Sequence, residues 1–108
     1  MNQLPHPIAD FVAANNAMDP QRIAAAFNLD ATVSDEGQLR RGREEIAAWA
    51  LEYVARYQST IEPTGLVQSS DAHVVRATVR GSFPGSPIAL SFHFQLQDKG
   101  IQSLEVTA

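Results

Sequence analysis

The apolar residues in the first half of the chain recur every three or four positions, which is the spacing of one helix face. This spacing predicts a loose arm over 1–6, a helix from Pro7 or Ile8 to about residue 17, a short helix opened by Asp19-Pro20, and a helix over about 43–57. Phe27 is expected on the apolar side of the second helix. The third helix has the clearest stripe, which consists of Ile46, Trp49, Ala50, Tyr53 and Tyr57.

Beyond Pro63 the spacing changes to an alternation of apolar and polar residues, which is typical of strands. We expect strands over 67–70, 73–83, 88–97 and 101–106, separated by turn-forming residues. The second strand has an apolar face made by Val75, Ala77, Val79, Gly81 and Phe83, and the third has one made by Leu90, Phe92, Phe94 and Leu96. The pattern predicts an antiparallel meander whose apolar face the helices must cover.

A hairpin is predicted between the second and third helices. Residues 31–33 favour a strand, Asp35-Glu36-Gly37 is a turn signal, and residues 38–41 return toward the third helix. Asp35 therefore ends a strand at a point where apolar side chains approach from both sides. Three helices followed by a strongly curved sheet make the predicted fold class α+β.

The composition limits the kinds of partner and site. The chain has 108 residues, a net charge of −4 and no cysteine, so we expect one domain over 1–108, no disulfide and no Cys-ligated metal. The acidic balance and the lack of basic runs argue against nucleic acid and membrane as partners. Neither a leader pattern nor a long apolar run is visible, so we expect a cytoplasmic protein. No phosphate-loop pattern or pair of histidines at ligand spacing occurs, so we expect no cofactor and no metal.

Several pieces of the chain resemble the nuclear transport factor 2-like superfamily, in particular its ketosteroid isomerase and SnoaL-like polyketide cyclase branches. The resemblance is closest over 10–35, in Phe11-Val12-Ala13-Ala14 and Asp30-Ala31-Thr32-Val33-Ser34-Asp35, and it continues at Gly42 and the Ile46/Trp49 pair. It implies a conical, cystatin-like α+β barrel in which three N-terminal helices pack on a mixed, mostly antiparallel sheet. It also implies a deep apolar pocket and a homodimer through the outer sheet face.

The resemblance assigns Asp35 to the position of the isomerase's general base, an aspartate that moves a proton next to a carbonyl group. The isomerase, which is a known example of this chemistry, also uses an oxyanion hole made by a tyrosine and a protonated aspartic acid. Phe11 and Phe92 occupy those two positions in this chain. Loss of even one donor of such a hole costs on the order of 10²–10³ in rate, so steroid isomerisation by the family mechanism is not expected.

Each candidate polar residue has a second interpretation. Asp35 is either a base whose pKa is raised by apolar walls or a turn-capping residue that accepts backbone N–H groups. Tyr53 either supplies the missing donor or packs in the core. His93 alternates with Phe92 and Phe94, so we expect it to face away from the pocket, toward a dimer interface, unless the register slips and gives it a catalytic position.

Two functions remain open at this stage. In the first, the domain binds an apolar, cyclic carbonyl compound and acts as a proton-transfer isomerase or cyclase with Asp35 as its base. In the second, it is a non-catalytic ligand-binding or dimerisation domain. The residues expected to form the pocket walls are Phe11, Ile46, Trp49, Tyr53, Val79, Phe83, Phe92 and Phe94.

Overall fold

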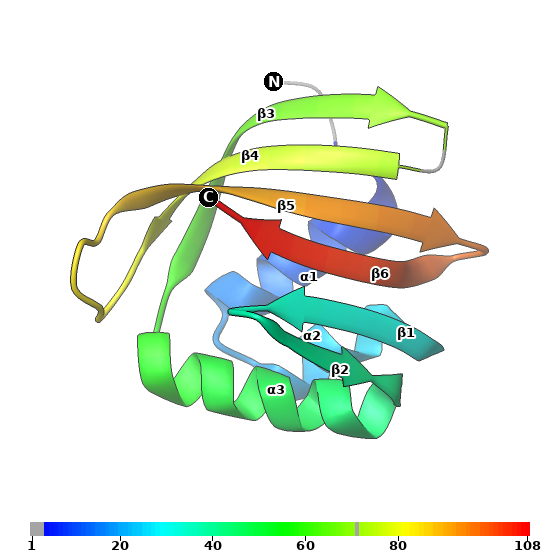
Figure 1. The fold of residues 1–108 in the computed structure, drawn as a ribbon, viewed down its shortest axis with the longest axis horizontal. Coiled ribbons are helices and arrows are strands. Elements are labelled where there is room, and N and C mark those ends of the chain that lie inside the picture. The colour runs from blue at the N-terminus through cyan, green and yellow to red at the C-terminus, as the bar shows by residue number, and fades with distance from the viewer. Residues whose placement is uncertain (1–3, 71) are drawn as a thin grey trace.

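The computed structural model describes residues 4–70 and 72–108 (Figure 1). The described residues form three helices and six strands, with a two-stranded hairpin between the second and third helices and four strands after the third. The helices are α1 (His6–Asn16), α2 (Pro20–Ala25) and α3 (Gly42–Tyr57), and the strands are β1 (Phe27–Asp35), β2 (Gln38–Arg41), β3 (Thr60–Ser69), β4 (Ala72–Arg80), β5 (Ile88–Gln97) and β6 (Gly100–Thr107). None of the described helices is long and apolar enough to cross a membrane.

One mixed sheet contains all six strands in the order β2-β1-β6-β5-β4-β3. The β1–β6 pair is parallel and the other four pairs are antiparallel. The sheet curves without closing into a barrel, and the three helices lie on its concave side (Figure 1). The α+β class with a mostly antiparallel sheet is confirmed, with the difference that the barrel is open.

The core lies between the concave face of the sheet and the helices. Alternation along the strands places Val75, Ala77 and Val79 of β4 in this core, and their neighbours Arg76 and Arg80 are exposed. In β5, the same alternation buries Phe92 and Phe94. The faces predicted from the sequence are therefore the observed ones, because one side of the sheet has no access to water.

The second helix ends earlier than predicted. It stops at Ala25, and Phe27 is the first residue of β1, where its ring is buried. The end of the helix is tied to the sheet because the Ile101 amide donates to the Ala26 carbonyl. A phenylalanine in the strand that follows a helix can extend the apolar face of that helix. The helical spacing of Phe27 therefore does not show whether it belongs to α2 or to β1. The first helix begins at His6, inside the predicted arm, and residues 1–3 lie outside the described residues.

Two strand boundaries also differ from the prediction. β3 begins at Thr60, well before residue 67, and includes Pro63. A proline cannot donate to a neighbouring strand, but β3 is an edge strand and its register shifts between Pro63 and Gly65. β4 ends at Arg80, so Phe83 belongs to the β4–β5 loop, because the Ser82 amide donates to the Tyr57 carbonyl of α3.

The β1–β2 hairpin has the tightness that the sequence predicts. Asp35 pairs with Gln38, and the two residues between them, Glu36 and Gly37, have φ values of 53° and 76°. Positive φ at both central positions is the geometry of a type I′ turn. Asp35 is therefore the last strand residue before a two-residue turn, and its backbone position is set by the sheet.

Candidate functional site

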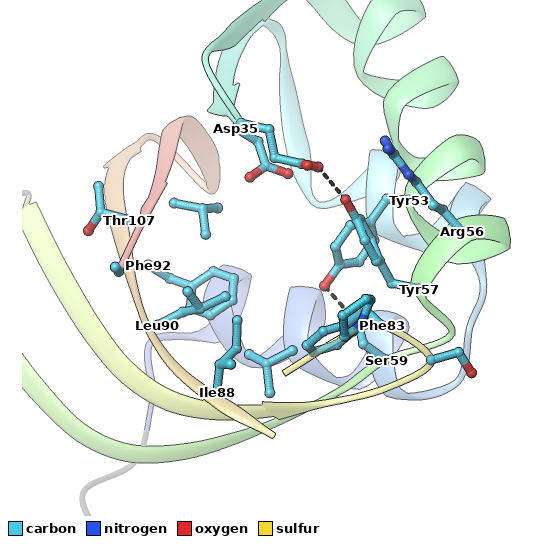
Figure 2. A pocket seen from close by; sticks show the side chains of 16 residues that line it. Asp35, Tyr53, Arg56, Tyr57, Ser59, Phe83, Ile88, Leu90, Phe92 and Thr107 are labelled. Atoms are coloured by element: carbon cyan, nitrogen blue, oxygen red, sulfur yellow. Dashed lines mark hydrogen bonds between the residues drawn. The ribbon is translucent and has the colours of Figure 1, made fainter. Parts of the chain in front are cut away.

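A largely apolar cavity of about 660 Å³ opens at the end of the molecule where β1, α3 and β6 end and the β4–β5 loop turns (Figures 1 and 2). The sheet forms one wall of the cavity and α3 forms another. The apolar lining comes chiefly from Val79, Phe83, Ile88, Leu90, Phe92 and Val106, and the polar groups nearest the inside are Asp35, Tyr53 and Ser59. The cavity is large enough for a compact ring compound.

Asp35 borders this cavity and is held by a tryptophan. The Trp49 Nε1–H donates to Asp35 Oδ2 at 3.2 Å. Trp49 is buried in the stripe of α3 that faces β1, so its indole has a fixed position. The bond therefore orients the carboxylate and leaves the Oδ1 atom without a side-chain donor among the hydrogen bonds of the described residues.

The pKa of Asp35 is raised above the ordinary aspartate value of 3.8. The main cause is burial, which disfavours the charged form, and the Trp49 hydrogen bond offsets part of this effect. The neighbouring Glu36 carboxylate raises the pKa further through like-charge repulsion. A carboxylate of this kind is a stronger proton acceptor than an exposed aspartate, so the site has the electrostatics that a general base requires.

A second polar group in the cavity is a pair of hydroxyls. The Tyr53 and Ser59 hydroxyl oxygens lie 3.0 Å apart (Figure 2), and either can donate. Ser59 is only 3% exposed, and the Asn15 side chain of α1 donates to its carbonyl oxygen at 3.1 Å. Burial and the Asn15 hydrogen bond therefore fix the position of Ser59, and Ser59 in turn holds the Tyr53 hydroxyl.

The mouth of the cavity is crossed by a short hydrogen bond. The Tyr57 hydroxyl donates to Glu36 Oε1 at 2.6 Å, which joins the end of α3 to the β1–β2 turn (Figure 2). This carboxylate raises the pKa of Tyr57 to about 12. The Tyr57 ring also packs edge-on against Phe83, with ring centroids 5.8 Å apart. The Arg56 guanidinium carbon lies 5.4 Å from the centroid of the Tyr57 ring. The Tyr57 hydroxyl is therefore already engaged.

The β4–β5 loop is fixed against the same end of α3. Besides the Ser82–Tyr57 backbone bond of 2.7 Å, Gly81 packs so closely that a Cβ atom there would lie 2.5 Å from the Tyr57 carbonyl oxygen and 2.9 Å from Ser59. Only glycine permits this approach. The loop that carries Phe83 is consequently held over the cavity.

A second, polar hollow of about 310 Å³ also borders Asp35. It shares Glu36 and Tyr57 with the first cavity and continues to Arg40 and Glu52, which form an ion pair at 3.1 Å. Asp35 therefore lies between an apolar cavity and a polar groove. Within the described residues, no group of three His, Cys, Asp or Glu side chains is arranged to hold a metal ion.

The structure brings together five of the nine residues predicted for the site. Those that line the cavity are Asp35, Tyr53, Val79, Phe83 and Phe92. Trp49 contacts the site through Asp35 and lines the polar hollow.

The remaining three predicted residues do not line the cavity. Phe11, Ile46 and Phe94 are at most 2% exposed and pack in the core. Phe11 contacts Phe94 edge-on with ring centroids 5.6 Å apart. The prediction of these three as wall residues needs correction, because the helices press on the sheet at this level and leave space only toward the open end.

Ser59 and the β5 residues Ile88 and Leu90 also line the cavity, although they were not predicted from the sequence. Leu90 belongs to the predicted inner face, so the alternation could have identified it. Ser59 follows the helix and had no signal, because its role depends on contact with Asn15 and Tyr53. His93 lies on the face opposite Phe92, as expected, with Nε2 3.0 Å from the Thr107 hydroxyl oxygen.

His73 was expected to be exposed, but it is half-buried. It pairs with Phe94 in the β4–β5 register and shares the inward side of β4 with Val75. Its buried Nδ1 atom has no hydrogen-bond partner in the described part of the chain. It is remote from the cavity lining.

Comparisons with known proteins agree with this arrangement. The family model of the SnoaL-like domain matches residues 8–103. The structure of a proposed polyketide cyclase from Sinorhizobium meliloti is 32% identical, with a TM-score of 0.91 and coverage of 96% of this chain and 95% of that one. No curated protein sequence matches significantly.

Two more distant structures share the fold. A protein from Catenulispora acidiphila with a ketosteroid isomerase-like fold, solved with trimethylamine, is 21% identical with a TM-score of 0.86, and covers 98% of this chain and 87% of that one. The epoxide hydrolase/cyclase-like enzyme SalBIII, described in pyran ring formation in the polyether salinomycin, is 23% identical with a TM-score of 0.81, and the match covers 94% and 86% of the two chains.

Proposed function

Because the chain belongs to the SnoaL-like family, we propose that its cavity binds an apolar, cyclic carbonyl compound and that Asp35 transfers a proton next to the carbonyl. One observation carries the proposal. A carboxylate with a raised pKa borders an apolar cavity, and a buried tryptophan orients it. Apolar walls of this kind select a ring body, and the carboxylate is the natural acceptor for a proton from that ring.

The proposed step is a simple proton abstraction. An Asp35 oxygen takes the proton from a carbon next to the carbonyl, the C–H electron pair forms a C=C bond, and the carbonyl π electrons move to its oxygen. In a ligand with a neighbouring C=C bond, return of the proton from Asp35 to the far carbon of the dienolate would complete an isomerisation. Alternatively, attack of the enolate carbon on a second carbonyl would close a ring, and the resulting alkoxide would take the proton back from Asp35. Trp49 holds the carboxylate in place during both transfers.

The relatives support the class of ligand. The Sinorhizobium meliloti structure is named as a proposed polyketide cyclase, and polyketides are carbonyl-rich chains that close into rings. The positions of the isomerase donors, Phe11 and Phe92, have no hydroxyl or carboxyl group. A steroid isomerase mechanism is therefore outside the proposal. The same two absences favour the alternative, a domain that binds its ligand without chemistry.

The test uses 2-tetralone, a bicyclic ketone with two CH₂ groups beside the carbonyl, of which the benzylic one exchanges its protons more readily when a base acts on it. In D₂O, we expect the protein to accelerate loss of this proton signal above the rate in buffer. Asp35→Asn should reduce the acceleration by about 10²–10⁴-fold and retain binding. Asp30→Asn makes the same change at an exposed site on β1 outside the cavity lining and serves as the matched control.

The result decides between the two functions. Binding with no exchange above the buffer rate would contradict the base role and leave the non-catalytic domain. Equal exchange by the wild-type protein and Asp35→Asn would show that another group removes the proton.

A further inference from the structure

The cavity contains a hydroxyl pair that the proton transfer alone does not use. We infer that the Tyr53 hydroxyl is the hydrogen-bond donor to the oxygen of the ligand and that Ser59 holds it in position. The inference deepens the proposed function, since it assigns the group that would bind the carbonyl on which Asp35 acts. It also specifies the ligand as a ring compound with an acceptor oxygen near its acidic carbon.

The chemistry of the pair favours Tyr53 as the donor toward the cavity. A hydroxyl has one hydrogen and two acceptor lone pairs. If Ser59 donates to the Tyr53 oxygen, the Tyr53 hydrogen is free for a ligand, and the ligand bond is strengthened by the one behind it. Burial raises the pKa of Tyr53, so its hydroxyl keeps its hydrogen at neutral pH.

Ser59 has little freedom to move. Its side chain is 3% exposed, its carbonyl accepts the Asn15 amide, and Gly81 is wedged against its Cα and Cβ atoms. A donor held by such a partner needs little reorganisation when a ligand arrives, which is the property that makes a fixed hydrogen bond effective.

The other hydroxyls of the cavity are less suited to this role. The Tyr57 hydroxyl donates to Glu36 at 2.6 Å. Thr107 lies 3.0 Å from His93 Nε2 on the outer side of the sheet. Ser82 belongs to the exposed β4–β5 loop. Tyr53 is the lining hydroxyl on the inner side of α3, and it faces the cavity beside Ser59 (Figure 2).

The two polar groups of the cavity, Asp35 and Tyr53, are connected through Trp49. The Tyr53 ring stacks on Trp49 with centroids 5.3 Å apart and planes 25° apart, and Trp49 donates to Asp35. Asp35 and Tyr53 therefore line the cavity and are joined by the indole, which itself lines the polar hollow, and Leu90 and Phe92 lie across the cavity from Tyr53 (Figure 2). A flat ring bound between Tyr53 and Phe92 would place its oxygen toward Tyr53 and its acidic carbon toward Asp35.

The experiment compares 2-tetralone with tetralin, which has the same bicyclic skeleton without the oxygen. Trp49, the single tryptophan, supplies a fluorescence signal for both dissociation constants. We expect the wild-type protein to prefer the ketone. Tyr53→Phe should lower that preference by about three- to tenfold, the effect of one hydrogen bond, and Ser59→Ala should lower it less.

Tyr57→Phe is the matched control, since it removes a hydroxyl one turn further along α3 that already binds Glu36. It should change both affinities alike and leave their ratio unchanged. A ketone preference that survives both Tyr53→Phe and Ser59→Ala would overturn the inference. Loss of the ketone preference in Tyr57→Phe alone would also overturn the inference.

The proton exchange of the same ketone separates this inference from the proposed function. Asp35→Asn should stop exchange and keep the ketone preference. If the wild-type protein shows no exchange but its preference depends on Tyr53, the base role fails and the donor assignment stands. If exchange depends on Asp35 but the preference does not depend on Tyr53, the donor assignment fails and the base role stands.

Discussion

At the scale of single residues, Asp35 combines a candidate function with a cost to stability. Its pKa is raised by burial, so the folded protein holds the carboxyl proton more tightly than the unfolded chain does. The folded state therefore loses stability relative to the unfolded state as the pH rises from the ordinary aspartate pKa through the pKa in the fold. Ionisation of Asp35 therefore lowers the stability of the folded protein.

Removal of this charge is expected to stabilise the protein. Asp35→Asn should have a larger free energy of unfolding than the wild-type protein at pH 7, and the difference should shrink as the pH falls below the aspartate pKa in the fold. Urea unfolding at pH 7 and at pH 3, below the ordinary aspartate pKa of 3.8, measures both values. A variant that is less stable at pH 7 would indicate that the carboxylate is held chiefly by its hydrogen bonds.

Trp49 reports the ionisation of Asp35 directly. Because the indole N–H donates to the carboxylate and no other tryptophan is present, protonation should change the fluorescence of the protein. We expect a titration midpoint above 3.8, and no such midpoint in Asp35→Asn. A midpoint at or below 3.8 in the wild-type protein would contradict the raised pKa.

The resemblance over 10–35 and the hairpin pattern located Asp35, and the alternation located Phe92 at the cavity. The contacts of Asp35 were not predictable. Trp49 has the helical spacing of a core residue, and the sequence contains no signal that its N–H reaches the end of β1. Ser59 is similar, since its partners Asn15 and Tyr53 come from two different helices.

At the scale of elements, the junction between α3 and β3 organises the mouth of the cavity. Tyr57 ends the helix, Gln58 turns the chain with a φ of 45°, and Ser59 is buried before β3 begins. Gly81 of the β4–β5 loop packs on this junction. Two segments that are distant in sequence, 57–60 and 81–82, therefore meet at one point.

A methyl group at this point should be costly. Gly81→Ala would place a Cβ atom 2.5 Å from the Tyr57 carbonyl oxygen, which is backbone and cannot rotate away. We expect a loss of about 1–3 kcal/mol in the free energy of unfolding, the usual cost of overpacking. Gly65→Ala, in the edge strand β3, meets only the Arg76 Cβ at 3.9 Å and is the control. Equal stabilities of the two variants would contradict the close packing.

The sequence predicted which elements exist better than it predicted where they end. The periodicity identified the three helices and the strands that follow, because one face of each is buried. The end of β4 and the start of β3 depend on contacts between distant segments. Pro63 suggests a break in a strand, and only its place at the sheet edge makes it acceptable.

At the scale of the whole molecule, the convex side of the sheet is the surface that the helices leave uncovered (Figure 1). Val67, which is 69% exposed, pairs with Val74 in the β3–β4 register, and Val74 pairs with His93. We expect two copies to associate through this face, because it combines exposed apolar side chains with polar neighbours.

Light scattering after size exclusion tests the association at micromolar concentration. Val67→Glu should shift the protein toward the monomer, because it places a charge in the expected interface. Leu51→Glu changes a residue of α3 that is 63% exposed, away from the sheet, and should leave the mass unchanged. A wild-type protein that remains monomeric would contradict the expectation.

The β1–β2 turn positions the acid of the cavity, and the β4–β5 loop forms much of its entrance. This separation affects how the ligand range of such a domain can change. The acid is positioned by a tight turn in the sheet, and much of the entrance is built by residues 81–87. The reactive group and the aperture are thus encoded separately along the chain. Replacing the loop after Gly81 with the corresponding loop of a relative should therefore change which ligands enter the cavity and leave Asp35 in place.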